Sequence, residues 1–575
     1  MDEDRRGRSA DGKGGRSTSG RNGRRLGGRG GRRSGGGSGR DAGGRDERGA
    51  AGGTPVTRVD EAVNRAADAA RDMAREIAEA ARTEAAVVLS AARAGRPPAG
   101  IPRGDDDEGY HQSLKPRHVQ MIAMGGAIGV GLFLGTAQRL HNAGPGLVLA
   151  YALAGIAAFF VMRALGELVL YRPTTGSFVA YARDFIGDWA GFASGWMYWL
   201  SWAATGVAEI TGVGIYVHYW APGFPQWASA LLALAVLLTV NLVSVRLFGE
   251  LEFWFAMLKV AAILAFMIVG IVLVATHAGI GPTHHAELPN LVDFGGFLPQ
   301  GMWAVLLSLQ GVIFAYAAIE MVGISAGEAQ NPREVMPRAI NGVVWRIALF
   351  YVGAVFLLVL ILPWTMYPRD RSPFVTVFAL LGVPGVGGVM NLVVLTAALS
   401  SCNSGLYSTG RILKSLARRG EAPAFTARMS ARHVPYGGIL LTSVVYFGGV
   451  FMNLFVPHKA FEIATSIASL GVLTTWGTLL YAQVRFRRAA ERGEVERPSY
   501  RMPGSPYTNW ATLALLAAVV PLMVFDRDQK WAVVAIPFLA MSLYGGWWAI
   551  NRRRVAAVVP AEALPEEGPA QDAVF

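Results

Sequence analysis

The chain has 575 residues, of which 52% are hydrophobic and only 16% are charged, and its formal net charge is +12. Ordinary soluble proteins carry about 25% charged residues, so this composition excludes an ordinary soluble globular protein and favours a membrane protein. The single cysteine, Cys402, excludes an intramolecular disulfide framework and a thiolate metal cluster.

Residues 1–109 differ in composition from the rest of the chain. Residues 1–50 are mostly Arg, Gly, Ser and Asp and cannot bury enough apolar surface to offset the entropy of ordering, whereas 58–94 are compatible with a surface helix. The Gly-Arg runs resemble RNA-binding tails, but no aromatic residue interleaves them, and the same charges suit anionic lipid headgroups. We expect a disordered, basic, cytoplasmic tail with no nucleic-acid partner. An upstream start codon would also explain it, and its lack of an apolar core argues against a signal peptide.

Twelve apolar windows follow, each long enough to cross about 30 Å of hydrocarbon as a helix. They span residues 119–139, 145–171, 189–219, 227–246, 253–275, 303–325, 341–363, 383–410, 436–456, 461–484, 509–526 and 532–551. The predicted fold class is therefore an all-α integral membrane protein, with a transmembrane domain at 110–555 and a cytoplasmic C-terminal tail at 556–575.

The basic residues between these windows predict an orientation, because short loops rich in Lys and Arg stay on the cytoplasmic side. The connection after the eighth window carries Arg411, Lys414, Arg418, Arg419, Arg428 and Arg432, and the connections after the sixth and tenth windows are also basic. The stretch 276–302 contains no Lys or Arg. The residues that contradict the pattern are Arg369, Arg371, Arg527 and Lys530. Both termini are expected in the cytoplasm.

Glycine interrupts the first and the sixth windows. The first interruption lies within 124–133 (MGGAIGVGLF) and the second within 311–323. A helix broken inside a bilayer leaves backbone groups that lipid cannot satisfy, so paired breaks at matching positions indicate the substrate site of a secondary transporter. Windows one to five and six to ten are odd-numbered sets, which predicts a 5+5 inverted repeat with discontinuous helices 1 and 6. Windows eleven and twelve are expected at the periphery or in a homo-oligomer contact.

Three charged residues inside the windows are candidates for proton coupling, since charges in a membrane span are costly. Glu320 either carries a proton or accepts hydrogen bonds that hold the second break open. Lys259 either shuttles a proton, occupies the place of a coupling sodium ion, or snorkels to the cytoplasmic interface. Glu209 either faces the cavity or pairs with a neighbouring helix. Arg163 and Glu167, one helical turn apart, are expected to pair with each other.

Other motifs give little chemistry. Trp196, Trp199 and Trp202 recur at helical spacing and are expected to pack or to form an interfacial belt. His284 and His285 lack a third ligand, so no metal is expected. The chain has no Walker motif and no Gly-x-Ser-x-Gly elbow, which argues against ATP-driven transport and against an enzyme. No cofactor is expected.

The residues at 110–133 (YHQSLKPRHVQMIAMGGAIGVGLF) resemble the opening signature of bacterial amino acid permeases of the amino acid–polyamine–organocation superfamily. The resemblance continues at 144–146, 166–168, 173–178, 252–255, 319–323, 326–328, 331–332 and 397–405, and it covers about 110–555. The stretches 195–198, 216–220, 345–353 and 434–439 resemble one substrate group within that family. The long basic tail is a departure.

This resemblance implies proton-coupled uptake of an amino acid across the inner membrane by a multi-pass protein. Free N–H groups at the first break would hold the substrate carboxylate, and those residues are Ile128, Gly129, Val130 and Gly131. Free carbonyls at the second break would accept from the substrate ammonium, and those residues are Phe314, Ala315 and Ala317. Phe314 resembles the aromatic gate of related permeases. Lys259 stands where sodium-coupled relatives bind an ion, which favours protons.

Several alternatives remain open at this point. The side-chain pocket does not distinguish asparagine from glycine, D-alanine, D-serine or an aromatic amino acid. An exchanger would require substrate on the opposite side of the membrane, and a non-transporting amino acid sensor would keep the same fold. A channel would need a continuous polar stripe, whereas these windows show isolated polar residues.

Overall fold

The computed structural model describes residues 128–558 except 175, 244, 282, 326–331, 432 and 527–528. The chain divides into two units, 1–98 and 99–575, and the described residues all belong to the second. The predicted tail 1–109, the signature up to residue 127, the motif at 326–328 with Asn331, and the C-terminal residues 559–575 lie outside the described residues. The predicted loop residues Arg432 and Arg527 also lie outside them.

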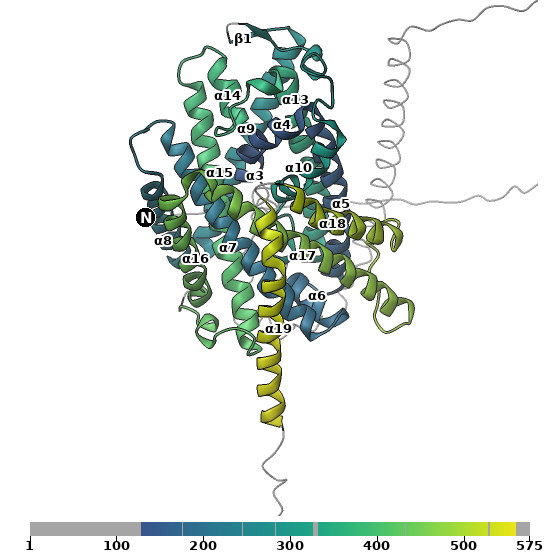
Figure 1. The fold of residues 1–575 in the computed structure, drawn as a ribbon. Coiled ribbons are helices and arrows are strands. Elements are labelled where there is room, and N and C mark those ends of the chain that lie inside the picture. The colour runs from purple at the N-terminus through teal and green to yellow at the C-terminus, as the bar shows by residue number, and fades with distance from the viewer. Residues whose placement is uncertain are drawn as a thin grey trace, which may run out of the picture. The chain divides into compact units, whose positions relative to one another are not determined.

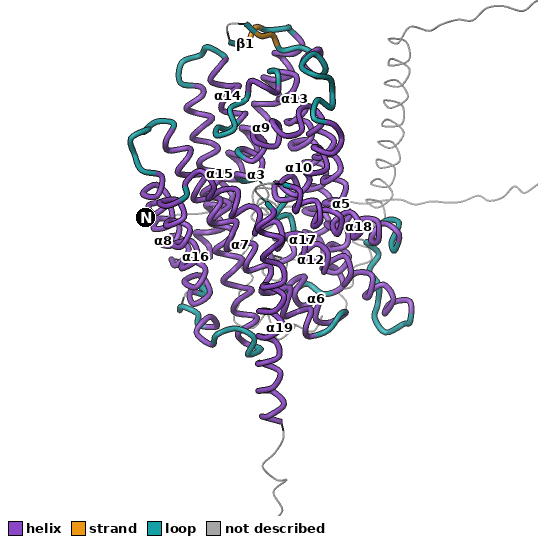
Figure 2. The backbone as a smooth tube through the Cα atoms, viewed as in Figure 1, coloured by secondary structure: helices purple, strands orange, loops and turns teal. Residues whose placement is uncertain are grey.

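Helices make up most of the described chain (Figures 1 and 2). Long apolar runs favour this outcome, because an α-helix satisfies its backbone groups within its own segment. In chain order the α-helices are α3 (Val130–Phe133), α4 (Gly135–Ala143), α5 (Leu147–Tyr171), α6 (Ser177–Phe185), α7 (Asp188–His218), α8 (Gln226–Val243), α9 (Val245–Ala275), α10 (Gly301–Ala315), α11 (Met321–Ser325), α12 (Pro332–Ile347), α13 (Ala354–Ile361), α14 (Pro373–Leu380), α15 (Val386–Arg418), α16 (Tyr436–Phe455), α17 (Pro457–Glu491), α18 (Tyr507–Phe525) and α19 (Lys530–Val558).

Shorter elements join these helices. A π-helical segment, Ala348–Gly353, connects α12 to α13, and 3₁₀ turns occupy Gly144–Gly146, Leu288–Leu291, Trp364–Met366 and Ala424–Ala427. Two strands, β1 (Gly279–Ile280) and β2 (His284–His285), pair antiparallel in the stretch 276–302. The all-α prediction therefore holds for the body of the protein and misses this small hairpin.

The predicted windows coincide with helices in the described part of the chain. Eight helical segments there are long and apolar enough to cross a membrane, the first being Val130–Tyr171, and three shorter apolar helices lie at Gln226–Leu242, Gly301–Ala315 and Leu349–Ile361. The Gly144–Gly146 turn divides the first segment into the first two predicted windows. The first half of the first window, up to residue 127, lies outside the described residues.

The two ends of the helical body carry different connections (Figure 1). At the end labelled β1 and α14, the β-hairpin stretch bonds to α13 and α14: Glu287 N–H donates to the Leu360 carbonyl over 3.0 Å, and Gly281 N–H to the Leu380 carbonyl over 3.4 Å. At the opposite end lies α6, whose Arg183 contacts Glu421 in the connection between α15 and α16. The loop without Lys or Arg and the Arg-rich connection are therefore at opposite ends.

Helix α7 lies in the core and packs most extensively against α15 and α17. Its small residues permit this close packing, as is typical of helix contacts in membranes. A methyl group at Gly206 would collide with the ring of Tyr446 on α16, and one at Gly471 of α17 would collide with Ser201. By contrast, the apolar side chains of α19 are largely exposed, as expected for a helix that faces lipid: Phe538 is 61% exposed. The predicted peripheral place of window twelve is confirmed.

Candidate functional site

The second predicted break is present between α10 and α11. Helix α10 ends at Ala315, α11 begins at Met321, and the residues between them form turns. Ala318 has a φ of 74°, in the left-handed region that residues other than glycine enter rarely. Such a conformation concentrates at functional sites, where the surrounding structure maintains it.

The carbonyl groups at this break are not all equivalent. The Phe314 carbonyl already accepts a hydrogen bond from Ala317 N–H over 3.0 Å. Within the part of the chain that the structure describes, no hydrogen bond ends on the carbonyl of Ala315 or of Ala317. These two carbonyls are therefore the open acceptors at the second break, and the prediction for Phe314 as an open acceptor is the weaker one.

Of the first break, the structure describes the part from Ile128 onward. Ile128 and Gly129 are non-helical, and α3 begins at Val130, with Gly129 extended at φ −133° and ψ −158°. The first N–H groups of a helix have no partner within the helix. The Val130 N–H instead donates to Glu209 Oε2 on α7 over 3.3 Å. One N–H that the sequence assigns to the substrate carboxylate is thus bonded to a carboxylate of the protein.

The two breaks touch each other. A methyl group at Gly131 would lie 2.8 Å from the Ala315 Cα and 3.2 Å from the Phe314 Cδ1. Because the first of these neighbours is backbone, no rotation of a side chain relieves the contact. Glycine at 131 therefore permits the close approach of the two breaks.

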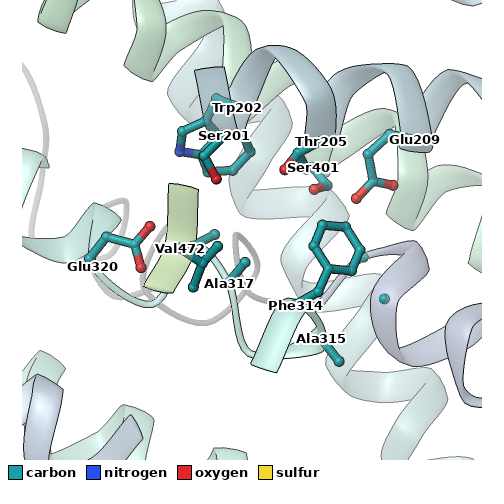
Figure 3. Close-up of a pocket in the computed structure, with 13 residues that line it drawn as sticks. Ser201, Trp202, Thr205, Glu209, Phe314, Ala315, Ala317, Glu320, Ser401 and Val472 are labelled. Atoms are coloured by element: carbon teal, nitrogen blue, oxygen red, sulfur yellow. The ribbon is translucent and has the colours of Figure 1, made fainter. Parts of the chain in front are cut away.

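A pocket lies between the breaks (Figure 3). It is lined by Gly129, Gly131, Ser201, Trp202, Thr205, Glu209, Phe314, Ala315, Ala317, Ala318, Glu320, Ser401 and Val472. All the predicted substrate-binding residues line it except Ile128 and Val130, which flank it in the chain. Two of the three predicted coupling residues, Glu209 and Glu320, also line it, and they stand on opposite sides of the view in Figure 3.

The two acids of the pocket have different partners. Besides the Val130 N–H, Glu209 is hydrogen-bonded to Ser401 on α15. Glu320 accepts from the indole N–H of Trp476 on α17 over 3.3 Å. Both carboxylates are almost wholly buried, at 2% exposure each. Each break thus has one buried carboxylate beside it.

A polar wall on α7 was missed by sequence reasoning. Ser201 and Thr205 are one turn apart, and Glu209 continues the same i, i+4 spacing, so the three share one helix face. The Ser201 hydroxyl donates to the Ala468 carbonyl over 2.8 Å. Thr205 is only 6% exposed, and no hydrogen bond within the described residues uses its hydroxyl. Trp202, expected to pack, also lines the pocket. The four-residue spacing is the signal that could have found this wall.

Lys259 lies behind the pocket rather than in it. Its side chain is fully buried, which contradicts snorkelling, and its Nζ is 4.0 Å from Glu252 Oε1. The Ser400 hydroxyl donates to Glu252 Oε2 over 2.7 Å. Lys259 also lies within electrostatic range of Glu209. No role was assigned to Glu252 from the sequence, in which it was included only in the family motif at 252–255. Glu252 is two turns before Lys259, so both residues lie on one face of α9.

The predicted pair of Arg163 and Glu167 is wrong. Glu167 accepts three hydrogen bonds from other elements: from Gln483 Nε2 over 2.8 Å, from Arg497 Nε over 2.6 Å and from Met502 N–H over 2.7 Å. The guanidinium of Arg163 lies 3.9 Å from the ring centroid of Tyr500. Sequence proximity favoured a local pair, but three donors around one buried carboxylate outweigh a single neighbour on the same helix.

A second buried ion pair lies at the same end of the protein. Arg183 on α6 donates to Glu421 with two nitrogens, over 2.8 and 2.7 Å, and Glu421 is fully buried. Burial alone lowers the pKa of Arg183, but its bonds to Glu421 and Asp188 more than offset that effect and raise the pKa above its ordinary value. Arg183 therefore stays charged at physiological pH, and its bonds to Glu421 join α6 to the connection after α15.

Comparisons with known proteins cover the same region. The family profile described as "Amino acid permease" matches residues 118–558. The L-asparagine permease of Streptomyces coelicolor is 55% identical over 457 residues, which are 79% of this chain and 93% of that protein. The L-asparagine permease of Escherichia coli is 50% identical over 473 residues, or 82% of this chain and 94% of that protein. The L-asparagine permease 2 of Mycobacterium tuberculosis is 52% identical over 457 residues, or 79% and 93%.

These relatives also identify the substrate group noted in the sequence. The stretches 195–198, 216–220, 345–353 and 434–439 are those that resemble L-asparagine permeases, and proteins of that name are matched over more than nine-tenths of their own length. The region matched begins near residue 118 and so leaves the basic tail outside it.

Proposed function

We propose that this chain, which belongs to the amino acid permease family, imports L-asparagine by proton symport across the cell inner membrane. The observation that carries the proposal is the pocket between two helix breaks, with open carbonyls on one side and helix N–H groups on the other. Curated relatives of about half identity are named for asparagine, which selects the substrate within this class.

The pocket suits the two ends of a free amino acid. Its carboxylate needs donors, which the backbone from Ile128 to Gly131 supplies at the start of α3. Its ammonium needs acceptors, which the carbonyls of Ala315 and Ala317 supply at the end of α10. Phe314 lines the same pocket and would cover the bound substrate.

The α7 wall suits an amide side chain. A primary amide presents one acceptor and one donor group, and hydroxyls both donate and accept, so Ser201 and Thr205 are matched to it. An aspartate side chain would instead add a further carboxylate to a pocket that already holds Glu209, Glu320 and the substrate's own α-carboxylate. Like charges in one buried site repel strongly, so the pocket favours asparagine over aspartate.

Proton coupling is assigned to Glu209, Glu320 and Lys259. The two carboxylates line the pocket, whereas Lys259 acts from behind it, through its electrostatic contact with Glu209. In the related sodium-coupled transporters an ion occupies the place of Lys259. A fixed ammonium at that position supports protons as the coupling ion.

We further infer twelve spans arranged as a 5+5 inverted repeat, with both termini in the cytoplasm. Helical structure at every window and the break at residues 316–320 support the repeat. The Arg-rich connection after α15 and the Lys- and Arg-free loop at 276–302 lie at opposite ends, which supports the orientation. The tail 1–109 and residues 556–575 would then flank the transport domain on the inside, and the exposed α19 offers a surface for a homo-oligomer.

Uptake into proteoliposomes tests the function. Purified protein is reconstituted, an inward proton gradient is imposed, and accumulation of radiolabelled L-asparagine is measured with and without a protonophore. We expect accumulation that the protonophore abolishes and that unlabelled asparagine competes for better than aspartate, glycine, D-alanine, D-serine or phenylalanine.

The other outcomes identify the alternatives. Accumulation of a different amino acid would keep the mechanism and change the substrate. Uptake that requires internal amino acid and ignores the protonophore would indicate an exchanger. Binding without any accumulation, by protein that elutes as a folded species, would indicate a sensor and refute symport.

A further inference from the structure

We propose that Glu209 and the substrate carboxylate compete for the Val130 N–H, and that this competition couples asparagine to the proton. The inference rests on the proposed function and adds to it the step that links the two ligands. A substrate carboxylate can reach this N–H only when the Glu209 carboxylate leaves it, and the displaced carboxylate then takes up a proton.

The geometry places both carboxylates at one point. Glu209 Oε2 accepts the Val130 N–H over 3.3 Å, and this is the first N–H of α3, between the pocket-lining residues Gly129 and Gly131. Glu209 Oε1 lies so close to Gly129 that a methyl group there would collide with it. The glycine backbone of the first break is therefore occupied by a protein carboxylate in the structure.

An independent observation, the hydroxyl of Thr205, indicates that the pocket between the breaks suits a polar ligand. Thr205, on the same α7 face and one turn before Glu209, is only 6% exposed, and no hydrogen bond within the described residues uses its hydroxyl. A buried hydroxyl without a partner costs free energy unless something fills its bonding capacity. A polar substrate whose carboxylate lies at Val130 would supply that partner.

The charges around Glu209 decide what happens when it is displaced. The titratable groups that face it are Lys259 on α9, Cys402 on α15, Tyr446 on α16, Tyr351 on the π-helical segment and Tyr216 on α7. Only Lys259 is a cation, and it already faces the Glu252 carboxylate at 4.0 Å. The Lys259 ammonium thus interacts electrostatically with two carboxylates, Glu252 and Glu209.

A displaced Glu209 anion would meet the incoming substrate carboxylate in a buried site. Two carboxylates so close together disfavour the ionisation of one of them. The Lys259 ammonium cannot fully neutralise the second negative charge, because it already faces Glu252. Glu209 therefore takes a proton from the outer aqueous phase and becomes neutral. When asparagine leaves on the inner side, Glu209 returns to the Val130 N–H and releases that proton.

This scheme fixes the sign of the pH dependence. The complex holds one more proton than the free protein, so asparagine binds more tightly as pH falls, by up to about tenfold per pH unit while Glu209 is ionised in the free state. Reciprocally, bound asparagine makes Glu209 hold its proton more tightly by the same factor.

Equilibrium binding of radiolabelled asparagine to purified protein, measured by scintillation proximity between about pH 6 and about pH 10, tests the proposal. We expect wild-type affinity to fall with rising pH. In Glu209→Gln the affinity should be almost independent of pH and close to the low-pH wild-type value, because a neutral amide releases the N–H readily. Glu320→Gln, which removes the other pocket carboxylate, is measured beside it, and Glu491→Gln, at an exposed carboxylate of α17 outside the pocket, should keep the wild-type slope.

A competitor without the carboxylate separates the roles further. 3-Aminopropanamide, which is asparagine without its carboxylate, has nothing to displace Glu209 with. Any competition it shows should be independent of pH in the wild type.

Each contrary result has a distinct meaning. Wild-type binding that does not vary with pH would overturn the proposal and mean that displaced Glu209 pairs with Lys259 instead. A slope lost in Glu320→Gln but kept in Glu209→Gln would also overturn it. Failure of folded wild-type protein to bind asparagine at any pH would instead refute the proposed substrate.

Discussion

Replacing Gly131 by alanine should separate the two helix breaks. The added methyl carbon would lie 2.8 Å from the Ala315 Cα and 3.3 Å from the Ala315 N. Carbon atoms attract best at about 3.5–4.0 Å, so the breaks must part by about 1 Å. Overpacking of this kind costs about 1–3 kcal/mol, and a misplacement of about 1 Å at a functional site can cost a further hundredfold in rate.

We therefore expect Gly131→Ala to fold but to lose at least about tenfold in asparagine affinity and more in uptake. Fluorescence-detected size exclusion and a thermal melt would establish folding, and proteoliposome uptake would measure function. Gly448→Ala on α16 is the matched control, because a methyl group there meets nothing within 4 Å. Uptake by Gly131→Ala equal to that of the control would refute the contact between the breaks.

Four further substitutions test other parts of the structure. Thr205→Val keeps the shape and removes the hydroxyl, and it should weaken asparagine binding by about 3–10-fold while changing alanine binding less; equal losses for both would remove Thr205 from the side-chain wall. Glu421→Ala removes the buried partner of Arg183 and leaves it the exposed Asp188, so the thermal melt should fall by several degrees, by about as much at high salt as at low salt because the lost pair is buried; an unchanged melt would show that the pair adds nothing. Glu252→Gln and Lys259→Met should each destabilise the protein, and the double variant should melt above either single variant, whereas additive losses would mean that the pair is not coupled.

The sequence was sufficient for the helices and for the breaks because both have local causes. A run of about 20 apolar residues determines a span by its own length. Glycine at 129 and 131 and the charge at Glu320 mark the breaks within single segments. The family resemblance then assigned substrate binding to Phe314, Ala315 and Ala317 at the second break, and all three line the pocket.

What the sequence could not supply is which helices meet. Glu167 pairs with Arg497, 330 positions away, and Arg183 pairs with Glu421, 238 positions away. The spacing of residues within one helix gives no information about partners on other helices. It therefore favoured the local but wrong pair of Arg163 and Glu167. The bond between Glu209 and the first break was missed for the same reason, since α7 and α3 are separated by three intervening helices and turns.

The α7 face that carries Ser201, Thr205 and Glu209 relates substrate length to recognition. Successive members are four residues apart and therefore rise by about 6 Å along the helix axis. A substrate anchored by its carboxylate near Glu209 would bring a short polar side chain to Thr205, and only a longer one would extend toward Ser201. Ser201 already donates to the Ala468 carbonyl, whereas no hydrogen bond within the described residues uses the Thr205 hydroxyl, so the hydroxyl nearer the anchor is the one left open. The wall would thus suit a side chain about as short as that of asparagine. Under the proposed coupling, α7 both contacts this side chain and carries Glu209, the carboxylate that the substrate displaces.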